Sequence, residues 1–202
     1  MKLYFSPASP FVRKVLVVLH ETGQGGDVEL VSVTGSALYP ETQPIAANPL
    51  GKIPVLTRDD GPAVADSRVI CRYLDARANA GLYPAPPRLW EVLTLEALAD
   101  GIGEAALAMV YEARYRPEEM RYAPWVEAQW GKVERGLDAI EARWLSHLSG
   151  RLDAAQIAVG CMLGYLDFRH GARGWRTGRP GLAAWYDSFA QRPSMLASLP
   201  PP

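Results

Sequence analysis

Residues 48–56, with the sequence NPLGKIPVL, constrain the fold of this 202-residue chain more than any other stretch. Asparagine, proline and glycine open the segment as a turn, and Ile53, Val55 and Leu56 have high strand propensity. Pro54 interrupts this apolar run, where it removes one donor from a sheet ladder. Such a proline either simply ends a strand at a sheet edge or lies in a tight turn with a cis peptide bond. In the cis case, the backbone N–H and C=O of Ile53 point out of the fold and can pair with an extended ligand backbone.

An acidic residue and a hydroxyl residue, Asp66 and Ser67, follow this segment. Behind them, apolar residues recur at helical spacing: Val69, Ile70, Tyr73 and Leu74. We therefore expect Asp66 as the N-cap and Ser67 as the first residue of a helix. Free N–H groups at a helix N-terminus bind a carboxylate, and the carboxylate of Asp66 can hold an ammonium group. The pair suits the head of an α-amino acid, although a plain helix cap has the same sequence signature.

The composition is that of an ordinary globular protein and argues against a nucleic-acid-binding, membrane-spanning or secreted protein. Hydrophobic residues make up 49% and charged residues 21% of the chain, and a net charge of -1 implies no general nucleic-acid-binding surface. No apolar run reaches the ~18 residues of a membrane span, and the N-terminus lacks the pattern of a signal peptide. Cys71 and Cys161 are expected as buried reduced thiols, which fits a cytoplasmic location. The three histidines are scattered, so no metal site with cysteine-histidine spacing is expected.

The chain divides into a mixed part and a helical part. Residues 1–80 follow the order β-α-β-α-β-β-α of a thioredoxin-like fold. The strands are expected near residues 3–5, 28–33, 55–57 and 63–65. The helices are expected near residues 11–19, 40–47 and 66–78, and the second of them is short and irregular. The segment 81–87 holds three prolines and one glycine and is interpreted as a linker. Residues 88–202 show only helical periodicity, which predicts a bundle around a central helix over residues 157–168. Asp153 and Gln156 before that helix have the spacing of a capping box.

Taken together, the NPLGKIPVL segment and the Asp66-Ser67 pair resemble the glutathione-binding half of the glutathione S-transferase family, of the bacterial cytosolic type. The resemblance extends over the whole chain. It implies an α/β domain followed by an all-α domain: a thioredoxin-like domain with a mixed four-stranded sheet, then an all-helical bundle. It also implies glutathione and a small electrophile as substrates and a homodimer, with no metal, nucleic acid or membrane as partner. The family usually carries an acid at the position of Gln156, so a weaker cap is expected here.

The resemblance assigns each part of glutathione to a residue. Asp66 would take the ammonium group, and Ser67 with the helix N-terminus would take the γ-glutamyl carboxylate. Ile53, held by Pro54, would pair with the cysteinyl backbone. Lys52 would neutralise the glycyl carboxylate; its alternative is a solvated turn lysine.

The thiol of glutathione must also be activated. A free cysteine thiol has a pKa of about 8.5, and lowering it by about two units takes roughly 2.7 kcal/mol. One hydrogen bond to a charged group contributes about 1.5–3 kcal/mol, so one hydroxyl at the start of the first helix is sufficient. Ser9 ranks first, because Ser9-Pro10-Phe11-Val12 resembles the Cys-Pro-Phe/Tyr-Cys motif of glutaredoxins with both cysteines replaced. The second candidate for thiol activation is Ser6, which matches the active-site serine of zeta-like enzymes. Tyr4 ranks third, because it is expected inside a strand. The alternative for Ser9 is a plain N-cap, with Pro10 as the first helical residue.

Serine in place of cysteine limits the chemistry. A mixed disulfide with glutathione needs a nucleophilic thiolate, which neither Ser6 nor Ser9 supplies, so thiol-transferase chemistry is disfavoured. Conjugation, isomerisation and glutathione-dependent peroxide reduction remain possible reactions. The alternative to an enzyme is a non-catalytic protein of the same fold, which binds glutathione or another protein and acts as a regulator or stress protein. The second substrate is expected between the domains, lined by Phe11, Met109, Tyr111, Arg114 and Tyr115, each of which also fits as core or helix surface. Arg114 and Arg116 indicate an anionic co-substrate.

Overall fold

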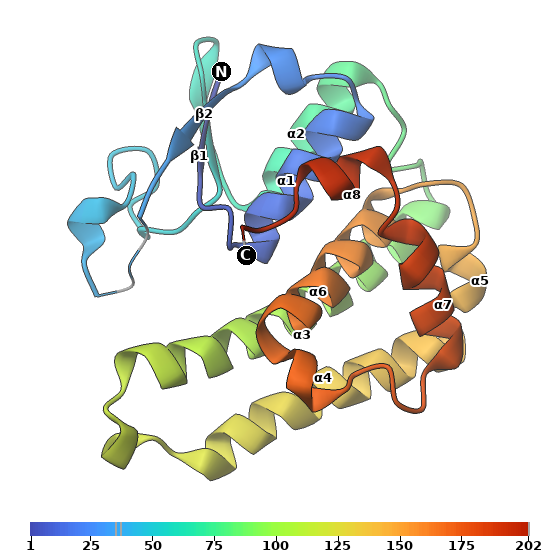
Figure 1. Ribbon diagram of the computed structural model, residues 1–202. Helices are drawn as coiled ribbons and strands as arrows, with labels where there is room; N and C mark the ends of the chain where they lie inside the picture. The colour runs from blue at the N-terminus through green and yellow to red at the C-terminus, as the bar shows by residue number, and fades with distance from the viewer. Residues whose placement is uncertain (35, 37, 202) are drawn as a thin grey trace. The chain divides into compact units, whose positions relative to one another are not determined.

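The computed structural model describes residues 1–34, 36 and 38–201, and the chain divides into two compact units. The first, here called the N-terminal unit, comprises Met1–Pro84 and Pro193–Pro202. The second, here called the helical unit, comprises Ala85–Arg192. The strands that the structure describes all lie in the N-terminal unit, and the helical unit contains helices and connecting turns (Figure 1). The predicted fold class is therefore confirmed.

The N-terminal unit is built on a mixed four-stranded sheet with the order β2-β1-β3-β4. Its strands are β1 (Lys2–Phe5), β2 (Glu29–Ser32), β3 (Val55–Arg58) and β4 (Gly61–Val64). β1 is parallel to β2 and antiparallel to β3, and β3 is antiparallel to β4. The two central strands hold the core, since Leu3 pairs with Leu56 and both side chains are fully buried.

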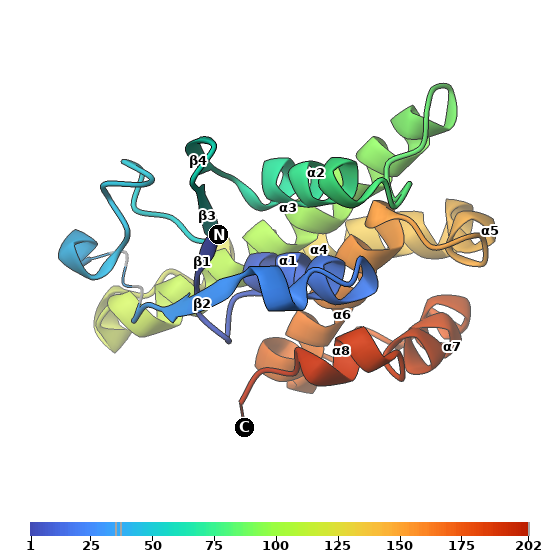
Figure 2. The same ribbon diagram turned by 90° about the horizontal axis from the view of Figure 1, so that it is seen from above.

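Two helices, α1 (Pro10–Glu21) and α2 (Ser67–Ala78), pack against each other in this unit, and Figure 2 shows them side by side. α1 presents a stripe of valines to the core, of which Val12 and Val15 are fully buried. Between β2 and β3, the sequence predicted a short irregular helix at residues 40–47. The structure has only a 3-10 turn there, η2 (Pro40–Thr42), followed by turns. A second 3-10 turn, η1 (Gly25–Asp27), precedes β2.

The end of the helical unit differs from the predicted domain boundary. The sequence placed residues 88–202 in one helical domain, whereas residues from Pro193 onward cluster with the N-terminal unit. A short helix, α8 (Pro193–Ala197), lies beside α1 (Figure 2). The buried Arg13 of α1 donates to the carbonyl oxygen of Met195 at 3.0 Å and to the Ser198 hydroxyl at 3.4 Å. These long-range bonds explain why a segment that looks like the tail of the bundle joins the other unit.

The helical unit consists of α3 (Arg88–Tyr115), α4 (Ala123–Arg143), α5 (Leu145–Leu148), α6 (Ala154–His170) and α7 (Pro180–Phe189), with 3-10 turns η3 (Glu118–Met120) and η4 (Gly171–Arg173). α3 packs against both α4 and α6. α6 is buried from Ala154 to Leu166, which confirms the predicted central helix. Its capping box is complete, because Asp153 caps the N-terminal amides and the Gln156 side chain accepts from the Asp153 N–H at 3.1 Å. Glutamine thus fulfils the role in which an acid was expected.

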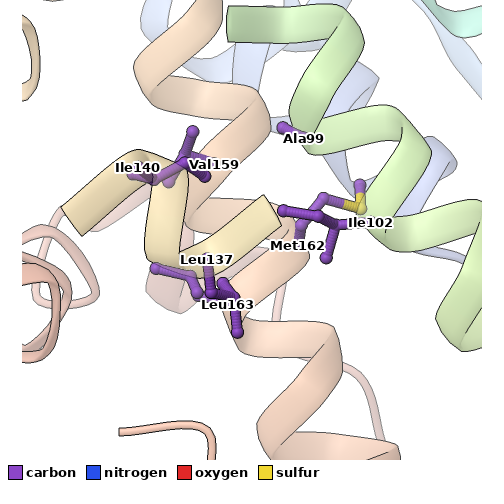
Figure 3. A pocket seen from close by; sticks show the side chains of 7 residues that line it. All are labelled: Ala99, Ile102, Leu137, Ile140, Val159, Met162 and Leu163. Atoms are coloured by element: carbon purple, nitrogen blue, oxygen red, sulfur yellow. The ribbon is translucent and has the colours of Figure 1, made fainter. Parts of the chain in front are cut away.

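The centre of the helical unit is a closely packed apolar cluster. Figure 3 shows side chains of α3, α4 and α6 pointing toward one another there, namely Ala99, Ile102, Leu137, Ile140, Val159, Met162 and Leu163. No water-sized space is left among them, and no polar surface lines the cluster. It is a closely packed hydrophobic core and not a ligand site.

The close contact between α6 and α7 predicts that one added methyl group lowers the stability of the fold. The ring of Phe189 lies against Gly160, where an alanine Cβ would collide with the Cε1 and Cδ1 atoms of that ring. We expect Gly160→Ala to lower the free energy of unfolding by about 1–3 kcal/mol through overpacking. The matched control is Gly101→Ala in the exposed part of α3, where an added Cβ meets no atom within 4 Å. This control should raise the free energy of unfolding by about 0.5–1 kcal/mol in urea titrations, and equal midpoints for both variants would contradict the prediction.

Candidate glutathione site

The turn before β3 has the geometry that Pro54 suggested. The Ile53-Pro54 peptide bond is cis, and Pro54 is buried at the entrance to the strand. Asn48 fixes the turn, because its side-chain amide donates to the Lys52 carbonyl at 2.9 Å and its carbonyl accepts from the Leu50 N–H at 3.1 Å. Gly51 adopts φ 59°, a conformation that glycine reaches without steric cost. Ile53 is half-buried and Lys52 exposed, so a ligand can reach both residues.

The Asp66-Ser67 pair opens α2 as predicted. Asp66 is the N-cap, and its Oδ1 accepts from the Arg68 N–H at 3.0 Å. Its Oδ2 accepts from the Arg68 guanidinium at 2.9 Å, with the Asp66 side chain 54% exposed. Burial acts to raise the pKa of Asp66, but the hydrogen bonds and charge of Arg68, with the charge of Lys14, hold that pKa below its ordinary value of 3.8. The carboxylate is therefore ionised at neutral pH, and Ser67 beside it is 3% exposed.

The two candidate serines lie in the loop between β1 and α1. Ser9 is the N-cap of α1, and its hydroxyl oxygen accepts from the Val12 N–H at 3.3 Å. This bond uses a lone pair and leaves the hydroxyl proton available to a thiolate. The Ser6 carbonyl accepts from the Ser9 N–H at 3.1 Å, and both serines are half-buried. Tyr4 lies inside β1, as the sequence indicated.

Strand pairing brings these three segments to one end of the sheet. The last part of β1, which leads into the serine loop, pairs with the start of β3 directly after the cis-proline, because Tyr4 lies opposite Val55. β4 is antiparallel to β3 with Leu56 opposite Val64, two residues before Asp66. The serine loop, the cis-proline turn and the N-terminus of α2 are thus anchored at the same sheet end. This arrangement can hold an extended peptide by its backbone and its α-amino acid head.

The residues predicted to bind a second substrate fall into two groups. Phe11 is half-buried on α1 in the N-terminal unit, whereas the other four lie on α3 in the helical unit. Met109 is 5% exposed and packs as a core residue. Tyr111 and Tyr115 face each other with ring centroids 5.2 Å apart. Arg114 lies close enough to Tyr111 for its charge to oppose the rise in the Tyr111 pKa that burial and Tyr115 cause.

Sequence reasoning missed two residues of α6 beside this group. Burial raises the pKa of Tyr165 to about 12, so its phenol keeps its proton at neutral pH, and Tyr111 and Arg114 are close enough to affect it. His170 has its Nε2 atom 3.0 Å from the Ala106 carbonyl, and burial lowers its pKa. Periodicity identified α6 as a buried helix but cannot say which of its turns lies against Tyr111. Among the described residues, no group of three or more metal-ligating side chains could hold an ion, and no helix is long and apolar enough to cross a membrane.

Comparison with known proteins extends over both units. Residues 3–85 match the N-terminal domain of glutathione S-transferases and residues 123–188 match the C-terminal domain. The chain is 34% identical to an uncharacterized GST-like protein, YibF of Escherichia coli (strain K12), over 100% of this chain and 99% of that protein. It is 46% identical to a glutathione transferase family member from Pseudomonas fluorescens Pf-5, crystallised with bound glutathione, with a TM-score of 0.97 over 100% of this chain and 99% of that one.

A second structure of a family member from the same organism contains S-(propanoic acid)-glutathione and matches at 46% identity and a TM-score of 0.92, with 100% of each chain covered. Sequence similarity therefore runs through both units. The chain belongs to the glutathione S-transferase family.

Proposed function

We propose that this protein is a glutathione transferase, which binds glutathione in the N-terminal unit and joins it through its sulfur to an electrophile. The observation that carries the proposal is the convergence of the serine loop, the cis-proline turn and the start of α2 at one sheet end. Bound glutathione in the 46% identical Pseudomonas fluorescens protein supports the same ligand here. A cytoplasmic location, where glutathione is abundant and thiols stay reduced, fits the two buried cysteines, which form no disulfide among the described residues.

In the proposed mechanism, the ligand lies along the turn as an added strand. Ile53 pairs with the cysteinyl backbone, Lys52 neutralises the glycyl carboxylate, and Asp66 with Ser67 holds the γ-glutamyl head. Lys52 suits its role because its exposed side chain forms no ion pair within the described part of the chain. The Ser9 hydroxyl donates to the thiol sulfur and stabilises the thiolate, with a further contribution from the N-terminus of α1. The thiol proton passes to solvent water, and the thiolate forms a carbon–sulfur bond with the electrophile. A leaving group departs from the electrophile, or an unsaturated acceptor takes up a proton from water.

Within the helical unit, the co-substrate is proposed to contact the side chains of Tyr111, Arg114 and Tyr115. The cationic Arg114 near two tyrosines favours an electrophile with an anionic group and an apolar body. The neighbour that binds S-(propanoic acid)-glutathione, a thioether with an added carboxylate, supports this class. Detoxification of such compounds is the role that this chemistry suggests.

The second candidate is a non-catalytic glutathione-binding regulator of the same fold. The presence of Ser9, Lys52, Ile53-Pro54 and Asp66-Ser67 in one chain favours the enzyme. Retention of the purified protein on immobilised glutathione, followed by assays with aromatic halides, acrylate-type acids and peroxides, separates the two. Retention and turnover support the transferase, and retention without turnover on the whole panel supports the regulator.

The transferase is expected to act as a symmetric homodimer. The large apolar side chains exposed on helices include Val69 of α2 at 50% and Trp90 of α3 at 61%. Burial of such groups in a self-complementary interface is favourable. Light scattering at micromolar protein should give twice the mass of one chain, and a Trp90→Glu variant should shift the mass toward one chain. If the wild-type protein has the mass of one chain, the prediction of a homodimer is wrong.

A further inference from the structure

We propose that the buried charge of Arg13 contributes to the activation of glutathione, by stabilising from within α1 the thiolate that Ser9 holds. The inference rests on the proposed function and deepens it, because it names a second group that sets the acidity of the bound thiol. Arg13 lies one helical turn after Ser9, and its backbone N–H donates to the Ser9 carbonyl at 3.0 Å. Its guanidinium carries a permanent positive charge.

The Arg13 guanidinium is buried and contacts only neutral groups. Arg13 is 6% exposed. Its Nη2 donates to the Met195 carbonyl at 3.0 Å and its Nε to the Ser198 hydroxyl at 3.4 Å, and both acceptors are uncharged. Among the residues that the structure describes, no carboxylate lies within ion-pair distance of Arg13. A buried cation without a counter-ion lowers stability, and an apolar side chain of similar size would be buried there at less cost.

The other charged groups on α1 and on the elements packed against it lie on different partners. α8 contains no charged residue, and its Ser194 hydroxyl donates to Glu21 in the last turn of α1, where His20 also lies. Lys14 lowers the pKa of Asp66 at the start of α2. The charged groups of α2 and η1 pair as follows: Arg68 with Asp66, Arg72 with the Tyr83 ring, Asp75 with the N–H groups of Leu82 and Tyr83, and Arg77 with Asp27. The described residues thus offer Arg13 no ionic partner, whereas a bound thiolate brings a negative charge.

The helix geometry brings this charge close to the proposed thiolate. Ser9 and Arg13 lie on the same face of α1, because residues four apart are neighbours along a helix. Four residues rise by roughly 6 Å, and helical side chains lean toward the N-terminus, which directs Arg13 toward the turn that Ser9 caps. Charges at this separation that are shielded from water attract each other more strongly than exposed charges do. The cation therefore stabilises the thiolate, and the thiolate offsets the cost of burying the cation.

Ultraviolet titration of the thiolate in glutathione complexes tests this interaction. Arg13→Gln removes the charge and keeps a donor for the Met195 carbonyl, and the pKa of its bound thiol should be higher by about half a unit to one unit. At a pH below the pKa of the bound thiol in both proteins, turnover of an aromatic halide should fall by the same factor, about three- to tenfold. Turnover should recover at high pH, where the thiol is ionised in both. Arg13→Lys keeps the charge and should titrate close to wild type.

Ser198→Ala is the matched control, because it removes the hydroxyl that accepts from Arg13 and leaves the charge in place. It reports a loosened contact between α1 and the end of the chain, and it should titrate like wild type. If Arg13→Gln does not fold, Arg13→Met, with an unbranched apolar side chain, should show the same shift. An unshifted curve in the uncharged variant, or an equal shift in Ser198→Ala or Arg13→Lys, overturns the inference. Failure of wild-type protein to bind glutathione at all overturns the proposed function itself.

Discussion

Ser9→Ala is expected to lower turnover at pH 7 by roughly ten- to a hundredfold while glutathione affinity changes little. The physical reason is the loss of one hydrogen bond to a charged sulfur, which contributes about 1.5–3 kcal/mol and so raises the pKa of the bound thiol by one to two units. The ends of glutathione bind elsewhere, at Lys52 and Asp66, so binding persists. The pH–rate profile should move to higher pH, and ultraviolet titration of the thiolate in the complex should show the same displacement.

Ser6→Ala is the matched control, since Ser6 lies in the same loop but is not the helix cap. Ser9→Ala also removes the acceptor of the Val12 N–H, at a cost of about 0.5–2 kcal/mol in stability, so all rates should be compared at temperatures where both variants are folded. A shift of the titration curve in Ser6→Ala alone would assign activation to Ser6, as in zeta-like enzymes. An unshifted curve in both variants would leave activation to the backbone amides at the start of α1.

A second large effect is expected at Asp66. Asp66→Asn keeps the size and the N-capping ability of the side chain, because asparagine caps helices as well as aspartate does. It removes the charge that is proposed to hold the γ-glutamyl ammonium, and a charge-assisted bond at this half-exposed position should be worth about tenfold in glutathione affinity. The free energy of unfolding should change by less than about 1 kcal/mol. Titration calorimetry and urea unfolding on the same preparation measure both quantities.

The pH dependence of glutathione binding gives an independent readout of Asp66. Because Arg68 holds the pKa of Asp66 below 3.8, the carboxylate is charged at all pH values above that range and becomes protonated only as the pH falls through the lowered pKa. Wild-type affinity should therefore stay constant from pH 7 down to about pH 4.5, as far as this group is concerned. Asp60→Asn, in the exposed turn between β3 and β4, is the control and should bind like wild type. If Asp66→Asn and Asp60→Asn bind glutathione with equal affinity, Asp66 serves only as a helix cap.

Several features of this protein were determined by the sequence alone, because each depends on neighbours along the chain. Capping depends on the residue before the first helical turn, so Ser9, Asp66 and Asp153 could be identified from spacing, and the structure confirms all three as N-caps. The local pattern also predicted the buried character of α6, whereas for Pro54 it left a strand end and a cis bond open, and the structure has the cis bond. The division into a mixed sheet and a helical bundle follows from hydrophobic periodicity, which changes after residue 87.

Other features required the tertiary structure, because they depend on residues far apart in the chain. The segment from Pro193 onward has the composition of a bundle tail, yet bonds from Arg13, 182 residues away, attach it to the N-terminal unit. Periodicity likewise could not place Tyr165 near enough to Tyr111 to affect its pKa, since it fixes a helix face and not its partner. Local sequence sets backbone conformation and caps, whereas long-range packing decides which side chains meet and which polar atoms are left for a ligand.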